Sequence, residues 1–499
     1  MVEPRAALPV ETPPDTVVAT LADTLRAAQF TADAVVGLLG LPAHAALGRN
    51  ETTPAVRATA DGSPLATLIR LFTLQRSVSR EAADRALPGL VDPLARAGLL
   101  ATSADEVRAL VDVRPYGDED HDWFVVCDPT PGLDARPVEV GPEHVLGISE
   151  ASSSLARLVA RRPVGRALDL GAGCGVQALH LAQHSGEVVA TDVNERALAM
   201  ARLTARLNGL DVDVRAGSLY EPVVGERFDL IASNPPFVVS PPDGERLVYR
   251  ETGFDGDDVV RRLVAGAADH LTEDGLCQLL ASWVHPTDVD WRERLASWIA
   301  PTGLDAWVVE REELDLPAYA EMWLADSGRR GRPGYTEAYD RWLSWFDEQK
   351  IAAMGFGWIT LRRAERDTPS VRIESYPGPV SGPVGDDVLA WTRAADALAA
   401  TPDPLAHAWH ARPDLVQVTA GPVGAGDPAS IRARVPHGVQ RERTLDTVEA
   451  GLLSASDGDL TAGQILDALA HLLDLDATDV RAHYTPAVTR LVTDGFLLS

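Results

Sequence analysis

The most informative segment of this chain reads Leu168-Asp169-Leu170-Gly171-Ala172-Gly173-Cys174-Gly175. An apolar run typical of a buried strand leads into a glycine-rich turn, and a helical pattern follows over residues 176–184. Glycine is needed in such a turn because the backbone bends tightly and a bulky ligand must approach without a Cβ in its way. The spacing is GxGxG and differs from the GxGxxG of dinucleotide-binding folds. Asp169, two residues before the first glycine, can reach a ligand amine, so the segment predicts a cationic ligand.

The next predicted strand also ends in an acidic residue. Its end reads Val189-Ala190-Thr191-Asp192-Val193-Asn194. Asp192 follows Asp169 by about twenty positions, the offset at which such folds present a carboxylate to ribose hydroxyl groups. Either carboxylate alone would be an ordinary residue of a turn after a strand. Together with the glycines they indicate that Asp192 binds a ribose, with Val193 and Asn194 beside it.

The most specific motif reads Phe228-Asp229-Leu230-Ile231-Ala232-Ser233-Asn234-Pro235-Pro236-Phe237, an apolar strand followed by Asn-Pro-Pro-aromatic. An amide or aromatic amine nitrogen is a poor nucleophile because its lone pair is delocalised. Hydrogen bonds from its two N–H groups to the Asn234 side-chain oxygen and the Pro235 carbonyl would favour pyramidal geometry and direct the lone pair at an electrophilic methyl group. The prolines fix that carbonyl, and Phe237 offers a flat face for stacking a planar amide or base. The candidate catalytic residues are therefore Asn234, Pro235, Pro236 and Phe237, although a simple loop followed by a core phenylalanine is the alternative.

These three segments together resemble class I S-adenosylmethionine-dependent N-methyltransferases of the small-domain group. That group includes release-factor glutamine methyltransferases, ribosomal RNA guanine-N2 methyltransferases and DNA adenine-N6 methyltransferases, and the resemblance covers roughly residues 145–365. It implies that S-adenosyl-L-methionine is the cofactor, with its methionine part at Asp169 and the glycines. Ser218 stands where many relatives present Asp to the adenine, so we expect Ser218 or the Leu219 backbone to make that contact. The implied cofactor-binding residues are Asp169, Gly171, Gly173, Gly175, Asp192, Val193, Asn194, Ser218, Leu219 and Asn234.

Two classes of methyl acceptor stay open. The segment Gly253-Phe254-Asp255-Gly256-Asp257 resembles the Gly-x-Asp-Gly segment of the glutamine methyltransferases, which favours a glutamine side-chain amide of a protein, in the translation machinery. Phe237, however, stands where those enzymes usually have Tyr, and Ala281-Ser282-Trp283 where they have a Glu-containing strand end. Phe is common in the RNA guanine enzymes, which typically follow it with His, whereas Val238 follows here. An exocyclic base amine of ribosomal RNA or DNA, guanine N2 or adenine N6, is therefore the alternative.

A second alternative is a non-catalytic protein that senses S-adenosylmethionine and transfers nothing. A damaged acceptor motif would mark such a protein, and residues 234–237 are intact. The enzyme is therefore the favoured interpretation.

Residues 146–365 alternate strand and helix patterns, which is typical of a doubly wound α/β sheet. We expect a Rossmann-like, seven-stranded methyltransferase core, with a helical insertion over residues 313–354 that could cover the site. The seven strands are predicted at residues 166–170, 188–191, 212–215, 228–233, 276–283, 306–310 and 357–362.

Two smaller modules flank this predicted core. Residues 1–145 show three helical runs and a hairpin, formed by residues 107–113 and 123–127, which suggests a winged-helix-like domain. Residues 366–395 are expected to form a Pro- and Gly-rich linker. Residues 396–499 repeat the helical order and suggest a second, small winged-helix-like domain. Because that region is acidic, protein contact or a structural cap is favoured over nucleic-acid binding.

The composition excludes several function classes. Lys and Arg total 45 and Asp and Glu total 73, a formal net charge of -28 that gives no general attraction to nucleic acid or an anionic membrane. The sequence has no apolar run near eighteen residues and no signal-like start, so we expect no membrane span. We expect a cytoplasmic location. The three cysteines are far apart, and His407 and His410 have no evident third partner. No metal site is expected.

Overall fold

The computed structural model describes residues 12–118, 120–135, 140–242, 256–423 and 428–499. These residues form two compact units. The first contains residues 1–156 and 163–374, and the second contains residues 157–162 and 375–499. The candidate site lies entirely within the first unit.

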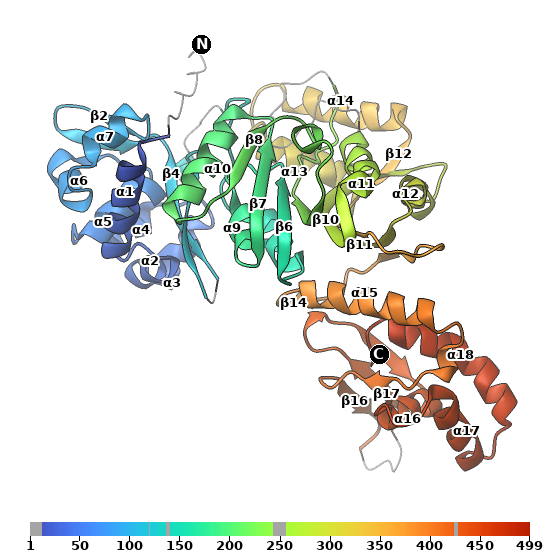
Figure 1. Cartoon of the computed structure of the whole chain (residues 1–499). Helices are drawn as coiled ribbons and strands as arrows, with labels where there is room; N and C mark the ends of the chain where they lie inside the picture. Colours follow the sequence, from blue (N-terminus) through green and yellow to red (C-terminus); the bar gives the residue numbers. More distant parts are fainter. Residues whose placement is uncertain (1–11, 119, 136–139, 243–255, 424–427) are drawn as a thin grey trace. The chain divides into compact units, whose positions relative to one another are not determined.

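The first unit is built on an eight-stranded sheet with the order β13-β11-β12-β10-β9-β6-β7-β8 (Figure 1). The five strands from β10 to β8 run parallel, and β12 is antiparallel to both of its neighbours. The bounds are β6 Val164–Leu170, β7 Ser185–Asp192, β8 Asp213–Ala216, β9 Phe228–Ser233, β10 Leu271–Pro286, β11 Asp305–Asp315, β12 Ile351–Arg362 and β13 Val371–Ser375. All seven predicted strands are present, and the Rossmann-like α/β core is confirmed.

The strand order also locates the ligand crevice. From β6 the chain moves outward through β7 and β8, and it then crosses to β9 on the other side of β6. Parallel strands ordered in this way bind ligands at the carboxyl ends of the two strands where the direction changes. Leu170 at the end of β6 is paired with Ser233 at the end of β9, so the glycine turn and the Asn-Pro-Pro motif begin side by side.

Helices pack on this sheet in two hydrophobic clusters. Helices α9 (Val176–Ala182) and α10 (Glu195–Leu207) share one cluster with the N-terminal helices. Helices α11 (Asp258–His270) and α12 (Trp291–Ile299) pack in another with the strands. The predicted insertion forms α13 (Leu316–Asp326) and α14 (Tyr335–Glu348), whose buried aromatic residues pack on Val238 and Val239. The insertion therefore supports the segment that follows the Asn-Pro-Pro motif, where the Tyr319 hydroxyl accepts a 2.8 Å hydrogen bond from Val239 N.

The N-terminal region contains short helices and two small antiparallel sheets, β1-β3-β2 and β4-β5. The predicted hairpin is present as β4-β5, but its first strand is shorter at its start than predicted. A bend at residues 110–111 splits the run 107–113, so that residues 107–109 belong to β3 in the other sheet. The apolar pattern continues through that bend and does not reveal it. The winged-helix interpretation stays a prediction. The bounds are α1 Asp15–Ala27, α2 Ala32–Leu39, α3 Leu41–Leu47, α4 Thr53–Ala58, α5 Pro64–Leu68, β1 Val78–Ser79, α6 Arg80–Ala86, α7 Val91–Arg96, β2 Leu100–Thr102, β3 Glu106–Ala109, β4 Asp112–Gly117 and β5 Asp122–Cys127.

Residues 366–395, predicted as a linker, contain regular structure. Strand β13 lies at the edge of the large sheet, and helix α15 (Gly385–Ala400) opens the second unit. The helix forms because Val388, Trp391 and Ala395 bury one face, a pattern that the neighbouring prolines and glycines obscure.

The second unit combines a three-stranded sheet, β16-β17-β19, with helices packed around one hydrophobic cluster. Its winged-helix interpretation also stays a prediction. No helix among the described residues has the length and apolar character that a membrane span requires. The main bounds are β16 Val416–Ala420, β17 Ser430–Arg434, β19 Glu442–Leu445, α16 Thr447–Ala455, α17 Ala462–Leu472 and α18 Ala477–Thr493.

Candidate functional site

The turn after β6 depends on its glycines. Gly171, Gly173 and Gly175 have φ angles of 77°, 55° and 85°, a region that residues with a Cβ rarely adopt. The turn is held against the next strand, because the N–H groups of Gly171 and Ala172 both donate to the Thr191 carbonyl, at 2.8 and 2.9 Å. The predicted strand, turn and helix are all present.

Asp169 is buried at the base of this turn. Its side chain accepts a 2.9 Å hydrogen bond from Ala178 N in the first turns of α9. Burial, opposed by that hydrogen bond, raises the pKa of its carboxyl group from 3.8 to about 7. Asp169 does not line the cavity described below, so the structure places it behind the turn. Its predicted contact with a ligand amine stays a prediction.

Asp192 closes the turn from the end of β7. One carboxylate oxygen accepts from Gly173 N at 2.9 Å and the other accepts from Asn194 N at 2.8 Å. Burial raises the pKa of this carboxyl group, opposed by these backbone hydrogen bonds. Each oxygen retains a second lone pair, so the side chain can accept further hydrogen bonds from two hydroxyl groups. Asn194 caps α10 through Arg196 N.

The acceptor motif follows β9 directly. The Asn234 side-chain oxygen is buried and has no hydrogen-bond partner among the described residues. The Ser233 hydroxyl donates to the Leu170 carbonyl at 2.6 Å, which ties the ends of β9 and β6 together. The Phe237 ring packs edge-on against Phe356 of β12, with ring centroids 6.3 Å apart, and lies off the cavity wall.

These loops surround one cavity of about 490 Å³. The predicted residues Asp169, Gly175 and Phe237 do not line it. Among the described residues, no Arg or Lys lines it, and Asp192 is the acidic residue of the wall. The predicted residues that do line it are Gly171, Gly173, Asp192, Val193, Asn194, Ser218, Leu219, Asn234, Pro235 and Pro236.

Sequence reasoning missed part of the wall. His144, Val145 and the start of α8 (Glu150–Leu158) line the cavity, as does Gln177 in α9. The one signal for α8 is the pair Ser149 and Ser152, which exchange hydrogen bonds between backbone N–H and hydroxyl oxygen as a capping pair does.

The Gly253–Asp257 segment is described only in part, since residues 253–255 lie outside the described residues. Asp257 is buried and makes two 2.6 Å ion-pair contacts with Arg294 of α12. It also accepts from Val284 N of β10 at 2.9 Å. Its carboxylate therefore fixes the start of α11 to β10 and α12.

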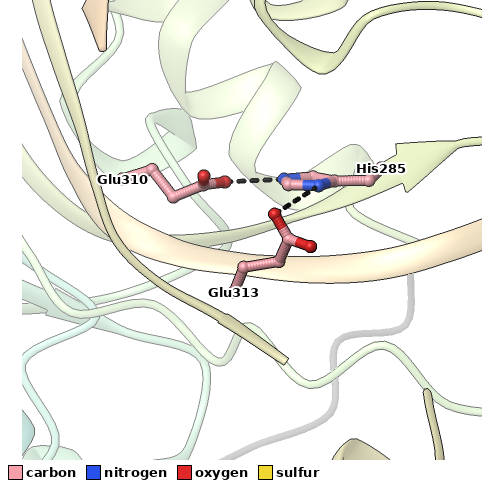
Figure 2. A group of neighbouring side chains, drawn as sticks. All are labelled: His285, Glu310 and Glu313. Carbon is pink, nitrogen blue, oxygen red and sulfur yellow. Dashed lines mark hydrogen bonds and ion pairs between the residues drawn. The ribbon is translucent and has the colours of Figure 1, made fainter. Parts of the chain in front are cut away.

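A second polar cluster lies at the ends of β10 and β11, where His285 stands between two glutamates (Figure 2). His285 Nε2 lies 2.6 Å from a Glu310 carboxylate oxygen, and His285 Nδ1 lies 3.7 Å from one of Glu313. The Trp283 indole N–H donates to the same Glu310 oxygen at 3.3 Å. The carboxylates approach different ring nitrogens, so the imidazole bridges them. One ligand atom from each of the three residues lies within 4.8 Å of the others, a spacing that could also hold a metal ion.

The strand order, the glycine turn and the cavity at the β6–β9 crossing together define a Rossmann-like protein with a ligand site at its switch point. Residues 147–289 match the family described as methyltransferase small domain, which confirms the resemblance predicted from the sequence. Residues 27–110 match a domain of unknown function, DUF7059.

Individual relatives cover the same region. The chain is 32% identical over 209 residues to ribosomal RNA small subunit methyltransferase C of Salmonella arizonae, covering 42% of this chain and 54% of that protein. It is 40% identical over 129 residues to release factor glutamine methyltransferase of Xylella fastidiosa, covering 24% and 47%. The chain thus spans about half the length of the curated relatives that it matches.

A solved structure of the Thermus thermophilus 16S rRNA N2 G1207 methyltransferase, in complex with AdoMet and guanosine, is 20% identical. The match covers 51% of this chain and 67% of that chain, with a TM-score of 0.28. The fold assignment therefore rests on the strand order of the chain itself.

Proposed function

We propose that this chain is an S-adenosylmethionine-dependent methyltransferase that acts on a planar NH2 group. The observation that carries the proposal is the buried, unpartnered side-chain oxygen of Asn234 on the wall of the cavity. A buried acceptor without a donor costs about 1–3 kcal/mol. A ligand NH2 group would supply the missing donor.

The order of the wall residues along the sheet matches the order of the parts of this cofactor. Along the sheet edge, β9, β6, β7 and β8 bring Asn234, the glycine turn, Asp192 and Ser218 into a row. Neighbouring strands are about 4.8 Å apart, so this row extends over roughly 14 Å. The order suits a methyl acceptor at Asn234, a methionine part at the turn, a ribose at Asp192 and an adenine at Ser218 and Leu219.

In this proposal, the residues of the chain position the cofactor and the methyl acceptor. When bound, S-adenosylmethionine supplies a methyl group on an electrophilic sulfonium. Asn234 and the Pro235 carbonyl accept hydrogen bonds from the acceptor NH2 group and orient its lone pair. The proton leaves for solvent after transfer, so the site needs no paired acid and base.

For the acceptor, we propose first a glutamine side-chain amide of a protein in the translation machinery, which places the enzyme in the cytoplasm. The net charge of -28 supports a protein over a polyanion. An exocyclic amine of ribosomal RNA is the second candidate. The match to the ribosomal RNA methyltransferase, over 209 residues, is longer than the 129 residues matched to the release factor enzyme.

The experiment that tests this proposal uses methyl-labelled S-adenosylmethionine and an extract of cells that lack the protein. The purified full chain is added, and the product is divided between protease and nuclease digestion. Label released by protease supports the glutamine acceptor, and label released by nuclease supports the base amine. Absence of label from both fractions contradicts a macromolecular acceptor.

A further inference from the structure

Gln177 presents a second unpartnered acceptor to the cavity. The residue is the second of α9, directly after the glycine turn, and only 5% of its surface is exposed. It lines the cavity, and its buried side-chain oxygen has no hydrogen-bond partner among the described residues.

The orientation of this amide is fixed by its other end. The Gln177 side-chain nitrogen donates a 2.7 Å hydrogen bond to the Ser152 carbonyl in α8. A flipped amide would bring two carbonyl oxygens together, so the nitrogen faces Ser152 and the oxygen is left as an acceptor. Ser152 is held in turn by the reciprocal hydrogen bonds with Ser149.

The position of Gln177 along the sheet indicates which part of the cofactor its side-chain oxygen can bind. Gln177 follows β6, which lies between β9 with Asn234 and β7 with Asp192. In the proposed function, that place belongs to the methionine part of the cofactor, whose donor is its α-ammonium group. Asp169 does not line the cavity, whereas Gln177 does and offers a neutral acceptor there.

We propose that Gln177 binds the α-ammonium group of S-adenosylmethionine through its side-chain oxygen. This inference rests on the proposed function and adds a binding residue outside the glycine motif. Ser152 is then a positioning residue, since it acts by orienting the Gln177 amide.

The test compares two ligands on the full chain by calorimetry. S-adenosylhomocysteine carries the α-ammonium group, and 5′-methylthioadenosine has the same adenosine and sulfur without the amino-acid end. Gln177→Met keeps the length of the side chain and removes the acceptor. We expect it to weaken S-adenosylhomocysteine binding about tenfold or more and to change 5′-methylthioadenosine binding less than about twofold.

The Gln177→Glu variant is the control for the contact with Ser152. Both variants lose the hydrogen bond to the Ser152 carbonyl, and only Gln177→Glu keeps an acceptor oxygen on the side of the cavity. It should bind S-adenosylhomocysteine at least ten times more tightly than Gln177→Met does, by the same estimate. An equal loss for both ligands in Gln177→Met, unchanged binding of both, or equal binding by the two variants would each overturn the inference. Failure of the unmodified chain to bind either ligand would instead overturn the proposed function and this inference with it.

Discussion

The Asp169 carboxyl group shows how one buried residue links the cofactor turn to stability. A carboxyl whose pKa rises from 3.8 to about 7 on folding is protonated in the folded chain and ionised in the unfolded chain between these values. The folded state then binds more protons, so its stability falls as the pH rises through this range. The stabilisation is fully present below 3.8 and is lost by about pH 7.

We predict that Asp169→Asn removes this pH dependence, because the amide mimics the protonated acid. Relative to the variant, the wild-type chain should lose about 1.4 kcal/mol of unfolding free energy per pH unit between pH 4 and 7. Denaturant unfolding at several pH values measures this difference. Asp211→Asn, at an exposed position, is the control, and its free energy of unfolding should change with pH as that of wild type does. Parallel curves for Asp169→Asn and wild type would contradict the role given to burial.

At the residue scale, the sequence predicts the site where a motif follows a strand end. Asp192 and Asn234 could be predicted in this way because the register of parallel strands brings those ends together. Gln177 and His144 could not, since Gln177 depends on a contact with α8 and His144 lies against Asp128, which follows β5. Phe237 lies off the wall because its ring packs on Phe356, from a strand far away in the sequence.

At the scale of elements, strand β12 accommodates the polar cluster of His285 and Glu310. Gly355 in this strand is paired with Trp283 of β10 and Glu313 of β11. A Cβ there would lie 2.5 Å from the Trp283 indole nitrogen and 2.9 Å from His285 Nε2, besides meeting the Glu310 carboxylate. The cluster therefore requires a glycine on the facing strand.

Gly355→Ala should destabilise the first unit by about 1–3 kcal/mol, the usual result of overpacking a buried position. Gly37→Ala in α2 is a matched control, because nothing lies within 4 Å of its added Cβ. It should stabilise the chain by roughly 0.5–1 kcal/mol. Thermal unfolding of both variants measures these changes in stability. An equal change in stability for the two variants would argue against the crowding at Gly355.

The sequence predicts the elements of the sheet well and their limits less well. All seven strands of the core are found, six because each is a largely apolar run between turn residues and β8 because apolar and polar residues alternate in it. Strand β12 begins at Ile351, earlier than the predicted residue 357, since its start lies in the aromatic-rich insertion. Strand β13 could not be predicted, because it is a partly exposed edge strand beside Pro- and Gly-rich sequence.

At the scale of the whole molecule, the N-terminal region and the core share one unit and one hydrophobic cluster. Phe124 of β5 exchanges two hydrogen bonds with the Asn208 side chain, at 2.9 and 2.8 Å. Asp128, just after β5, binds Arg196 of α10 at 2.9 Å and accepts from Val145 N of the cavity wall at 2.9 Å. Helical and apolar patterns cannot reveal such contacts, because the partners are 17 to 84 positions apart.

Arg196→Met should lower the free energy of unfolding by about 3–5 kcal/mol, since it leaves the buried Asp128 carboxylate without its cation. Arg206→Met on the same helix is the control. Its partner Asp15 has a side chain 91% exposed, and loss of such a surface pair costs at most about 1 kcal/mol. Chemical denaturation of both variants measures the two losses in free energy of unfolding. A similar small loss in both would mean that the N-terminal region is not anchored through Asp128.

In the proposed function, one cavity holds the cofactor and Asn234 orients the acceptor within it. The most direct test compares wild type with Asn234→Ala in two measurements. Calorimetry gives the affinity for S-adenosylhomocysteine, and transfer of labelled methyl to macromolecules of an extract lacking the protein gives the activity. Asn234→Ala should bind the cofactor within about threefold of wild type, and its transfer should fall by roughly 10²–10³, as when one oriented hydrogen-bonding group is removed. Transfer by Asn234→Ala at the wild-type rate, or cofactor binding by wild type without any transfer, would contradict the proposed function.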